Sequence, residues 1–171
     1  MWLFERTLCI LGLMAVLALS GCGYQLSASA PIALPEGMTA LYLENIVNPT
    51  TQSWLDPTLR STLRDEFTRR GQVRWVEKQE ANGLLEVEIL SYTSGSKLEN
   101  ALEETVRSQV VLQLQASIVR GTDQTRAWSS GRISARESFS GPEDGPEARD
   151  AEQRVVDLAV EKLADSLGQE F

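Results

Sequence analysis

One cysteine stands where covalent lipid chemistry would use it. Cys22 follows Leu19-Ser20-Gly21, and small residues just before it leave the extended, uncrowded backbone that a signal peptidase needs at its cut. The uncharged run from Thr7 to Leu19 has the length of a signal-peptide core and is shorter than the ~20 residues of a membrane-spanning helix. The pattern predicts a bacterial lipobox, in which the thiol takes a diacylglyceryl group and the freed amine is acylated. Several chains on one residue would anchor the protein stably, since a single chain binds only marginally.

The alternative is an uncleaved anchor helix in which Cys22 is incidental, and Glu5 beside Arg6 weakens the basic start that a signal peptide needs. We expect residues 1–21 to be the signal peptide, 22–38 a lipidated tether and turn, and 39–171 one domain. Cys9 would leave with the signal, so the mature chain would hold neither a free thiol nor a disulfide. Such an exported domain depends on an ordinary hydrophobic core.

Composition excludes several classes of function. The chain has no histidine, which removes the commonest general base and metal ligand. A net charge of −8 argues against nucleic acid as a partner. Carboxylates alone could serve an envelope glycosidase, and Glu86 and Glu88 are the only nearby pair, but an exposed strand face is a poor acid–base site. We expect no enzyme, no metal and no cofactor other than the covalent lipid on Cys22.

Two stretches show helical spacing. In the first, an apolar residue recurs every four positions, at Leu55, Leu59, Leu63 and Phe67. Asp56 is expected as its N-cap and Gly71 as the residue just past its end. The second stretch runs from Pro146 to about Leu167, with Gly168 expected beyond its last turn.

Alternation of apolar and polar residues predicts the strands. The clearest run is 104–120, and a return strand is expected over 126–139. Trp128 falls on the opposite parity from Ile133, which predicts a bulge or register change near 129–131. Shorter strands are expected over 39–46, 73–77 and 85–92, and a Ser/Gly loop over 93–100.

These elements predict an α+β fold, with a mostly antiparallel sheet of about four to five strands and two helices packed on one face. Three segments then resemble the LPS-assembly lipoprotein family, LptE. They are Gly-Cys-Gly-Tyr-Gln-Leu at 21–26, Leu-Pro-Glu-Gly-Met at 34–38 and Leu-Arg-Asp-Glu-Phe-Thr-Arg-Arg-Gly at 63–71.

The resemblance implies a lipoprotein of the outer membrane that faces the periplasm. Family members plug a large β-barrel translocon, LptD, help it to fold and assist the delivery of lipopolysaccharide to the cell surface. Gly23 is not the Asp that retains lipoproteins in the inner membrane of enteric bacteria. The expected partners are an LptD-type outer-membrane β-barrel and, as a second partner, lipopolysaccharide itself. A different periplasmic lipoprotein, one that stabilises an envelope secretion or transport complex, is the alternative.

A direct contact with lipopolysaccharide phosphates would need local cations despite the acidic total. The candidates for contact with lipopolysaccharide or with the barrel are Lys97, Arg107, Arg132 and Arg136. No basic position of the family aligns onto these residues, and solvated or barrel-facing side chains are the simpler interpretation.

Overall fold

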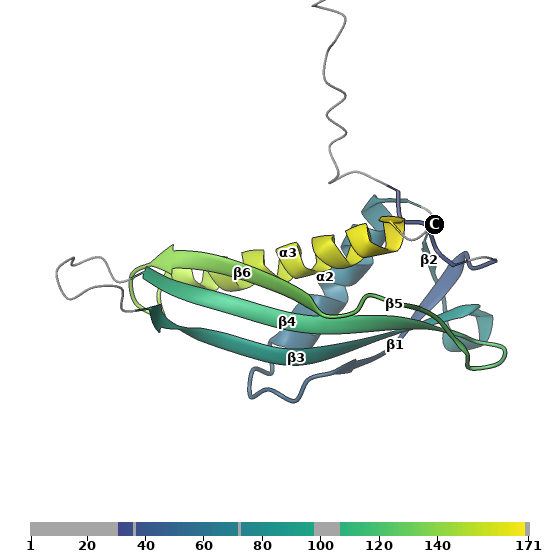
Figure 1. The fold of residues 1–171 in the computed structure, drawn as a ribbon, viewed down its shortest axis with the longest axis horizontal. Coiled ribbons are helices and arrows are strands. Elements are labelled where there is room, and N and C mark those ends of the chain that lie inside the picture. Colours follow the sequence, from purple (N-terminus) through teal and green to yellow (C-terminus); the bar gives the residue numbers. More distant parts are fainter. Residues whose placement is uncertain (1–30, 36, 72, 98–106, 170–171) are drawn as a thin grey trace, which may run out of the picture.

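The computed structural model describes residues 31–35, 37–71, 73–97 and 107–169 (Figure 1). In chain order, the elements are β1 Ala40–Val47, α2 Leu55–Arg69, β2 Arg74–Trp75, the short 3-10 helix η2 Lys78–Glu80, β3 Gly83–Lys97, β4 Arg107–Arg120, β5 Arg126–Ser129, β6 Ile133–Ser140 and α3 Pro146–Gln169. No helix among these residues is both long enough and apolar enough to span a membrane.

The strands form one sheet in the order β2-β1-β3-β4-β5, with β6 also paired to β4. Every pairing of β4 is antiparallel, whereas β1 runs parallel to both β2 and β3. The α+β prediction is confirmed, and the mostly antiparallel sheet is mixed. The parallel pairing arises because α2 crosses over between β1 and β2 and returns the chain to the same direction. Alternation along a strand carries no information about that direction.

The predicted strand over 126–139 is two strands that lie end to end beside β4. β5 pairs with residues 117–119 of β4, and β6 pairs with residues 107–114. The chain leaves the ladder between them at Ser130–Arg132, where Gly131 takes a positive φ of 62°. This break resets the side-chain parity, so Trp128 and Ile133 both point into the core.

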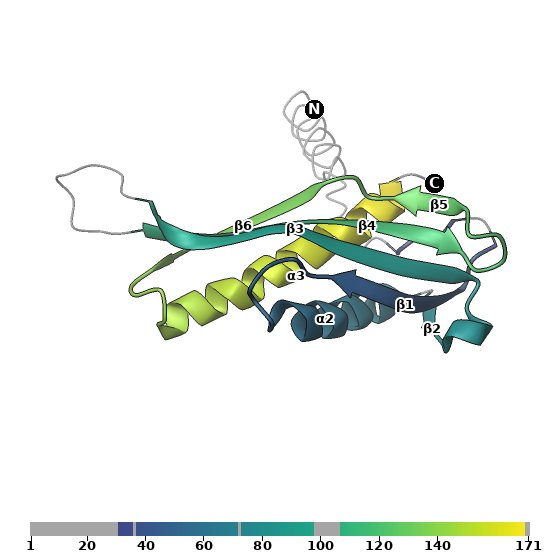
Figure 2. The same cartoon turned by 90° about the horizontal axis from the view of Figure 1, so that it is seen from below.

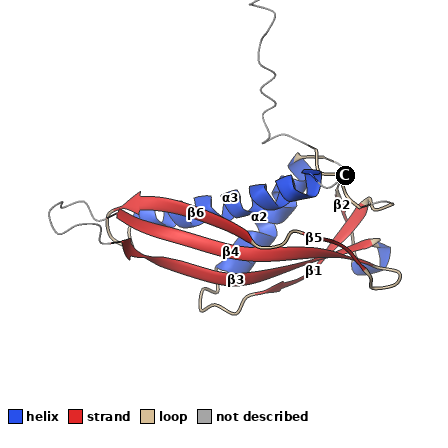
Figure 3. Cartoon of the chain, viewed as in Figure 1, coloured by secondary structure: helices blue, strands red, loops and turns tan. Residues whose placement is uncertain are grey.

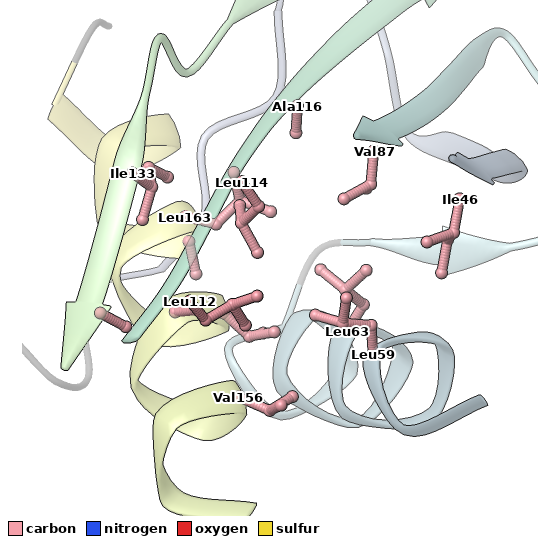
Figure 4. Packing of buried hydrophobic residues seen from close by; sticks show 14 of the residues in the cluster. Ile46, Leu59, Leu63, Val87, Leu112, Leu114, Ala116, Ile133, Val156 and Leu163 are labelled. Atoms are coloured by element: carbon pink, nitrogen blue, oxygen red, sulfur yellow. The ribbon is translucent and has the colours of Figure 1, made fainter. Parts of the chain in front are cut away.

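Both helices cover the same face of the sheet (Figures 1 and 3). In β4 every second residue, from Ser108 to Ile118, is buried beneath the helices, while the residues between them are half-buried. Leu59 and Leu63 of α2 meet Val156 and Leu163 of α3 below the apolar face of β4 (Figure 4). The core therefore lies in a single layer between the sheet and the two helices.

Several predicted boundaries are wrong, each for a local reason. Helix α2 begins one residue earlier than expected, so Asp56 lies in its first turn, paired with Arg60 at 3.4 Å, and the N-cap Trp54 makes no side-chain cap. Gly168 lies inside α3, not beyond it. The expected loop from residue 93 onward continues as strand to Lys97, because pairing with β4 outweighs the weak strand preference of Ser and Gly.

The described chain begins packed against the domain. Ile32 is fully buried, and the carbonyl oxygen of Pro31 lies 3.6 Å from the position that a Cβ at Gly168 would take. The end of the expected tether is therefore part of the core, near the C-terminal end of α3. Cys22 and the signal peptide lie outside the described residues.

Candidate interaction surface

The face of the sheet that the helices leave uncovered is the candidate site, and we call it the outer face. Its residues alternate in β3, β4 and β6 with those buried in the core. It comprises Glu86, Glu88, Ser91, Thr93, Gln109, Val111, Gln113, Gln115, Ser117, Ser134, Arg136 and Ser138. Apart from Val111 these side chains are polar, and most are uncharged, so the outer face can hydrogen-bond to a partner over most of its length.

The predicted cationic residues are distributed unevenly over this face. Lys97 and Arg107 occupy paired backbone positions at the open end of β3 and β4; their side chains are not described. Arg136 is exposed on β6 beside Val111, roughly 13 Å along β4 from Arg107 at 3.3 to 3.4 Å per residue. Arg132 is exposed in the break between β5 and β6, farther from that end. The fold thus brings three of the four candidates toward one end of the sheet.

The other end of the outer face is hollowed and carries acidic groups. A depression of about 290 Å³ is lined by residues of four strands, among them Glu86, Glu88, Gln115 and Arg126. The Gln115 side-chain amide donates a hydrogen bond of 2.7 Å to the Glu88 carboxylate. Both glutamates are exposed on the same side of β3, as alternation predicts, but only the β4–β5 pairing places Arg126 beside them. The described residues contain no group of His, Cys, Asp and Glu that could hold a metal ion.

An ion-pair cluster ties the helices that support this sheet. The Arg70 side chain is only 1% exposed; its Nε donates to Glu66 and its Nη1 to Asp165 of α3, both at 2.6 Å. Burial opposes ionisation of Glu66, but hydrogen bonds from Arg69 and Arg70 outweigh it and lower the pKa of Glu66. The sequence shows Arg70 only as a basic residue near a helix end, and nothing in it indicates that this guanidinium joins α2 to α3.

A second contact joins β3 to both helices. The Tyr92 hydroxyl donates to the Glu152 carboxylate of α3 at 2.9 Å, and its ring meets Trp54 edge-on, with 5.6 Å between ring centroids. Burial and the neighbouring Glu152 carboxylate raise the pKa of Tyr92 far above its ordinary value, so its hydroxyl stays protonated as a donor. Both clusters hold the sheet in a defined place on the helices and leave its outer face free.

The comparisons with solved structures show a fold shared at low sequence identity. Protein CT253 from Chlamydia trachomatis is 9% identical with a TM-score of 0.51, and the match covers 76% of this chain and 98% of that one. A lipoprotein from Caulobacter crescentus is 14% identical with a TM-score of 0.48, covering 72% and 87%. A minor lipoprotein from Acinetobacter baumannii is 13% identical with a TM-score of 0.46, covering 81% and 93%. No curated protein matches the sequence.

The family comparison is more specific. The model of the LptE family, described as lipopolysaccharide-assembly, matches residues 38–170. That match begins at the turn before β1 and includes every strand and both helices described above. Because it spans more than three quarters of the sequence, the chain belongs to the LptE family of lipopolysaccharide-assembly proteins.

Proposed function

We propose that this protein is an outer-membrane lipoprotein that plugs an LptD-type β-barrel, helps it to assemble and so assists the delivery of lipopolysaccharide to the cell surface. The observation that carries the proposal is the family match over residues 38–170. The role is one of binding and assembly, without a reaction of its own.

The geometry of the outer face supports this role. Large barrels have polar interiors that can hold a folded domain. A domain whose sheet presents glutamine, serine and threonine side chains on its uncovered side can hydrogen-bond to such a wall. Lys97, Arg107 and Arg136 would contact either acidic groups of the barrel or phosphates of lipopolysaccharide, and Arg132 is the more distant candidate.

The partner is tested by co-purification from native membranes. The full lipidated chain, tagged at its C-terminus, is extracted in mild detergent, and we expect a large outer-membrane β-barrel to accompany it. Gln113→Trp would place a bulky ring at the centre of the outer face and is expected to reduce the recovered barrel strongly. Gln153→Trp, at an exposed position of α3, is the matched control and should not.

Recovery of intact lipoprotein without any barrel would contradict the proposal. Recovery of a secretion complex in its place would favour the alternative role of a lipoprotein that stabilises a different envelope machine. Depletion separates the two further, because loss of surface lipopolysaccharide with normal secretion agrees only with the first.

The membrane anchor is proposed from the sequence around Cys22. Cys22→Ala removes the thiol that would receive the diacylglyceryl group, so the precursor should remain uncleaved and should not incorporate radioactive palmitate. The unmodified chain, processed and labelled in parallel, is the control. A Cys22→Ala chain that is still cleaved and labelled would refute the assignment.

A further inference from the structure

The two long edges of the sheet differ in how they are covered. Along β6, helix α3 lies close by: Lys162 Nζ donates to the backbone carbonyl of Ser134 at 2.8 Å, and Arg154 pairs with Glu137 at 3.3 Å. A lysine that occupies an edge carbonyl and a helix beside the strand are devices that protect an edge from further pairing. The β6 edge is therefore closed.

The opposite edge is open over half of β3. β1 pairs with β3 only as far as Val47 beside Glu88, and the register shifts between Ile89 and Ser91. From Ser91 to Lys97 β3 pairs with β4 on one side, and on its other side no strand of the described residues is paired with it (Figure 2). Seven residues at about 3.4 Å each make a row of backbone donors and acceptors roughly 24 Å long.

This open stretch lacks the usual protection of an edge. Natural edges carry charged side chains, proline, bulges or a covering helix, or they are very short. The described side chains here are small and uncharged apart from one aromatic ring: Ser91, Tyr92, Thr93 and Ser94, followed by Gly95. The other outer strands, β2 and β5, have two and four residues. The part of β3 beyond the bulge is thus the longest unprotected edge in the described part of the chain.

We propose that an extended segment of the barrel partner adds to the sheet as a further strand along Ser91–Lys97; this inference rests on the proposed function. An alternating row of N–H and C=O groups is complementary to another polypeptide strand, which pairs by its own backbone. Tyr92 and Trp54, both half-buried, lie on the helix side of this edge and offer ring surface to a side chain of the added strand.

The chemistry of the edge restricts the segment that binds. The strands of a closed barrel wall have no free edge of their own, so the segment must be a loop or a terminal extension of the barrel protein. It must lack proline at the paired positions. The net charge of −8 favours a neutral or basic segment and disfavours a second copy of this chain.

Two adjacent proline variants test the edge. N–H groups of successive residues in a strand point to opposite sides, so one of Thr93 and Ser94 donates toward β4 and the other toward the open edge. Thr93→Pro and Ser94→Pro are each made in the full lipidated chain. The variant whose N–H faces the open edge should fold, as judged by circular dichroism, and should recover at least about tenfold less barrel than the wild type, because proline blocks a pairing strand.

A second measurement does not depend on how the variants fold. Hydrogen exchange of the peptide that covers residues 89–97 is compared between the isolated wild-type chain and its detergent complex with the barrel. Slowed exchange in the complex supports strand addition. Unchanged exchange there, or a folded proline variant that recovers the barrel at the wild-type level, overturns it while leaving the proposed function intact.

Two further outcomes also decide the matter. Failure of the wild-type chain to recover any barrel would overturn both proposals together. A dimer of the isolated chain in which these amides are already protected would assign the edge to a second copy and overturn the barrel segment as its occupant.

Discussion

At the scale of single residues, Arg70 is the least expendable charge that the structure describes. Its guanidinium is buried and bridges two carboxylates on different helices, as a planar fork with several donors can do and an ammonium group cannot. Arg69, only one residue away, pairs with the same Glu66 but is 58% exposed. Two adjacent arginines therefore differ in their contribution to stability through burial alone.

Arg70→Ala should lower the free energy of unfolding by about 2–4 kcal/mol, because it leaves Glu66 and Asp165 without their shared partner in a partly buried site. Arg69→Ala is the control and should cost less than about 1 kcal/mol, as for other exposed ion pairs. Urea unfolding of the domain without signal and lipid measures both. Equal losses in the two variants would contradict the assignment.

Glu66 gives the same cluster a dependence on pH. Because its pKa is lowered in the folded state, the stabilisation is present above the ordinary glutamate value of 4.5 and is lost as the pH falls through the folded pKa. Unfolding curves taken between neutral pH and pH 3 should show a decline that Arg70→Ala reduces. A decline of the same size in that variant would assign the acid sensitivity to other carboxylates.

At the scale of elements, β4 separates a structural face from an interacting one. Leu114 is fully buried under the helices, whereas its neighbour Gln113 points to the outer face. Leu114→Ala should destabilise the domain by about 2–5 kcal/mol through lost burial and a cavity. Gln113→Ala should change stability by no more than about 0.5 kcal/mol, as surface substitutions usually do. Denaturant midpoints of the two variants measure the difference, and similar losses would contradict this division of the strand.

Periodicity predicted the existence and type of the long elements because their side chains alternate or recur with little interruption, as in β4 and at Leu55, Leu59, Leu63 and Phe67. It missed the C-terminal extension of β3, where Ser94 and Gly95 have low strand preference and only the partner strand holds them extended. It also missed the parallel placement of β1, which depends on how α2 packs. Local sequence carries no signal for either.

The candidate surface was foreseen in part for the same reason. Alternation correctly placed Arg136, Gln113 and Gln115 on the uncovered face. The approach of Arg126 to Glu86 and Glu88, and the open edge beyond Ser91, both depend on the register between strands and on where β1 ends. Such features belong to the assembled sheet and not to any one segment.

At the scale of the whole molecule, one side of the sheet serves stability and the other is free for a partner. The helices, the core and both side-chain clusters lie on one side, and the outer face and the open part of β3 are left uncovered (Figures 1 and 2). The described chain begins beside the end of α3, at Pro31. In the proposed role, lipid on Cys22 would keep the domain at the membrane, and the free side would meet the barrel.

Site-specific photocrosslinking in living cells tests this central claim most directly. A photoreactive residue at Gln113 or Arg136, both on the outer face of the full lipidated chain, should form an adduct that contains a large outer-membrane β-barrel. If both positions yield no adduct, or only adducts with a secretion complex, while the protein is present at its normal level, the account is contradicted.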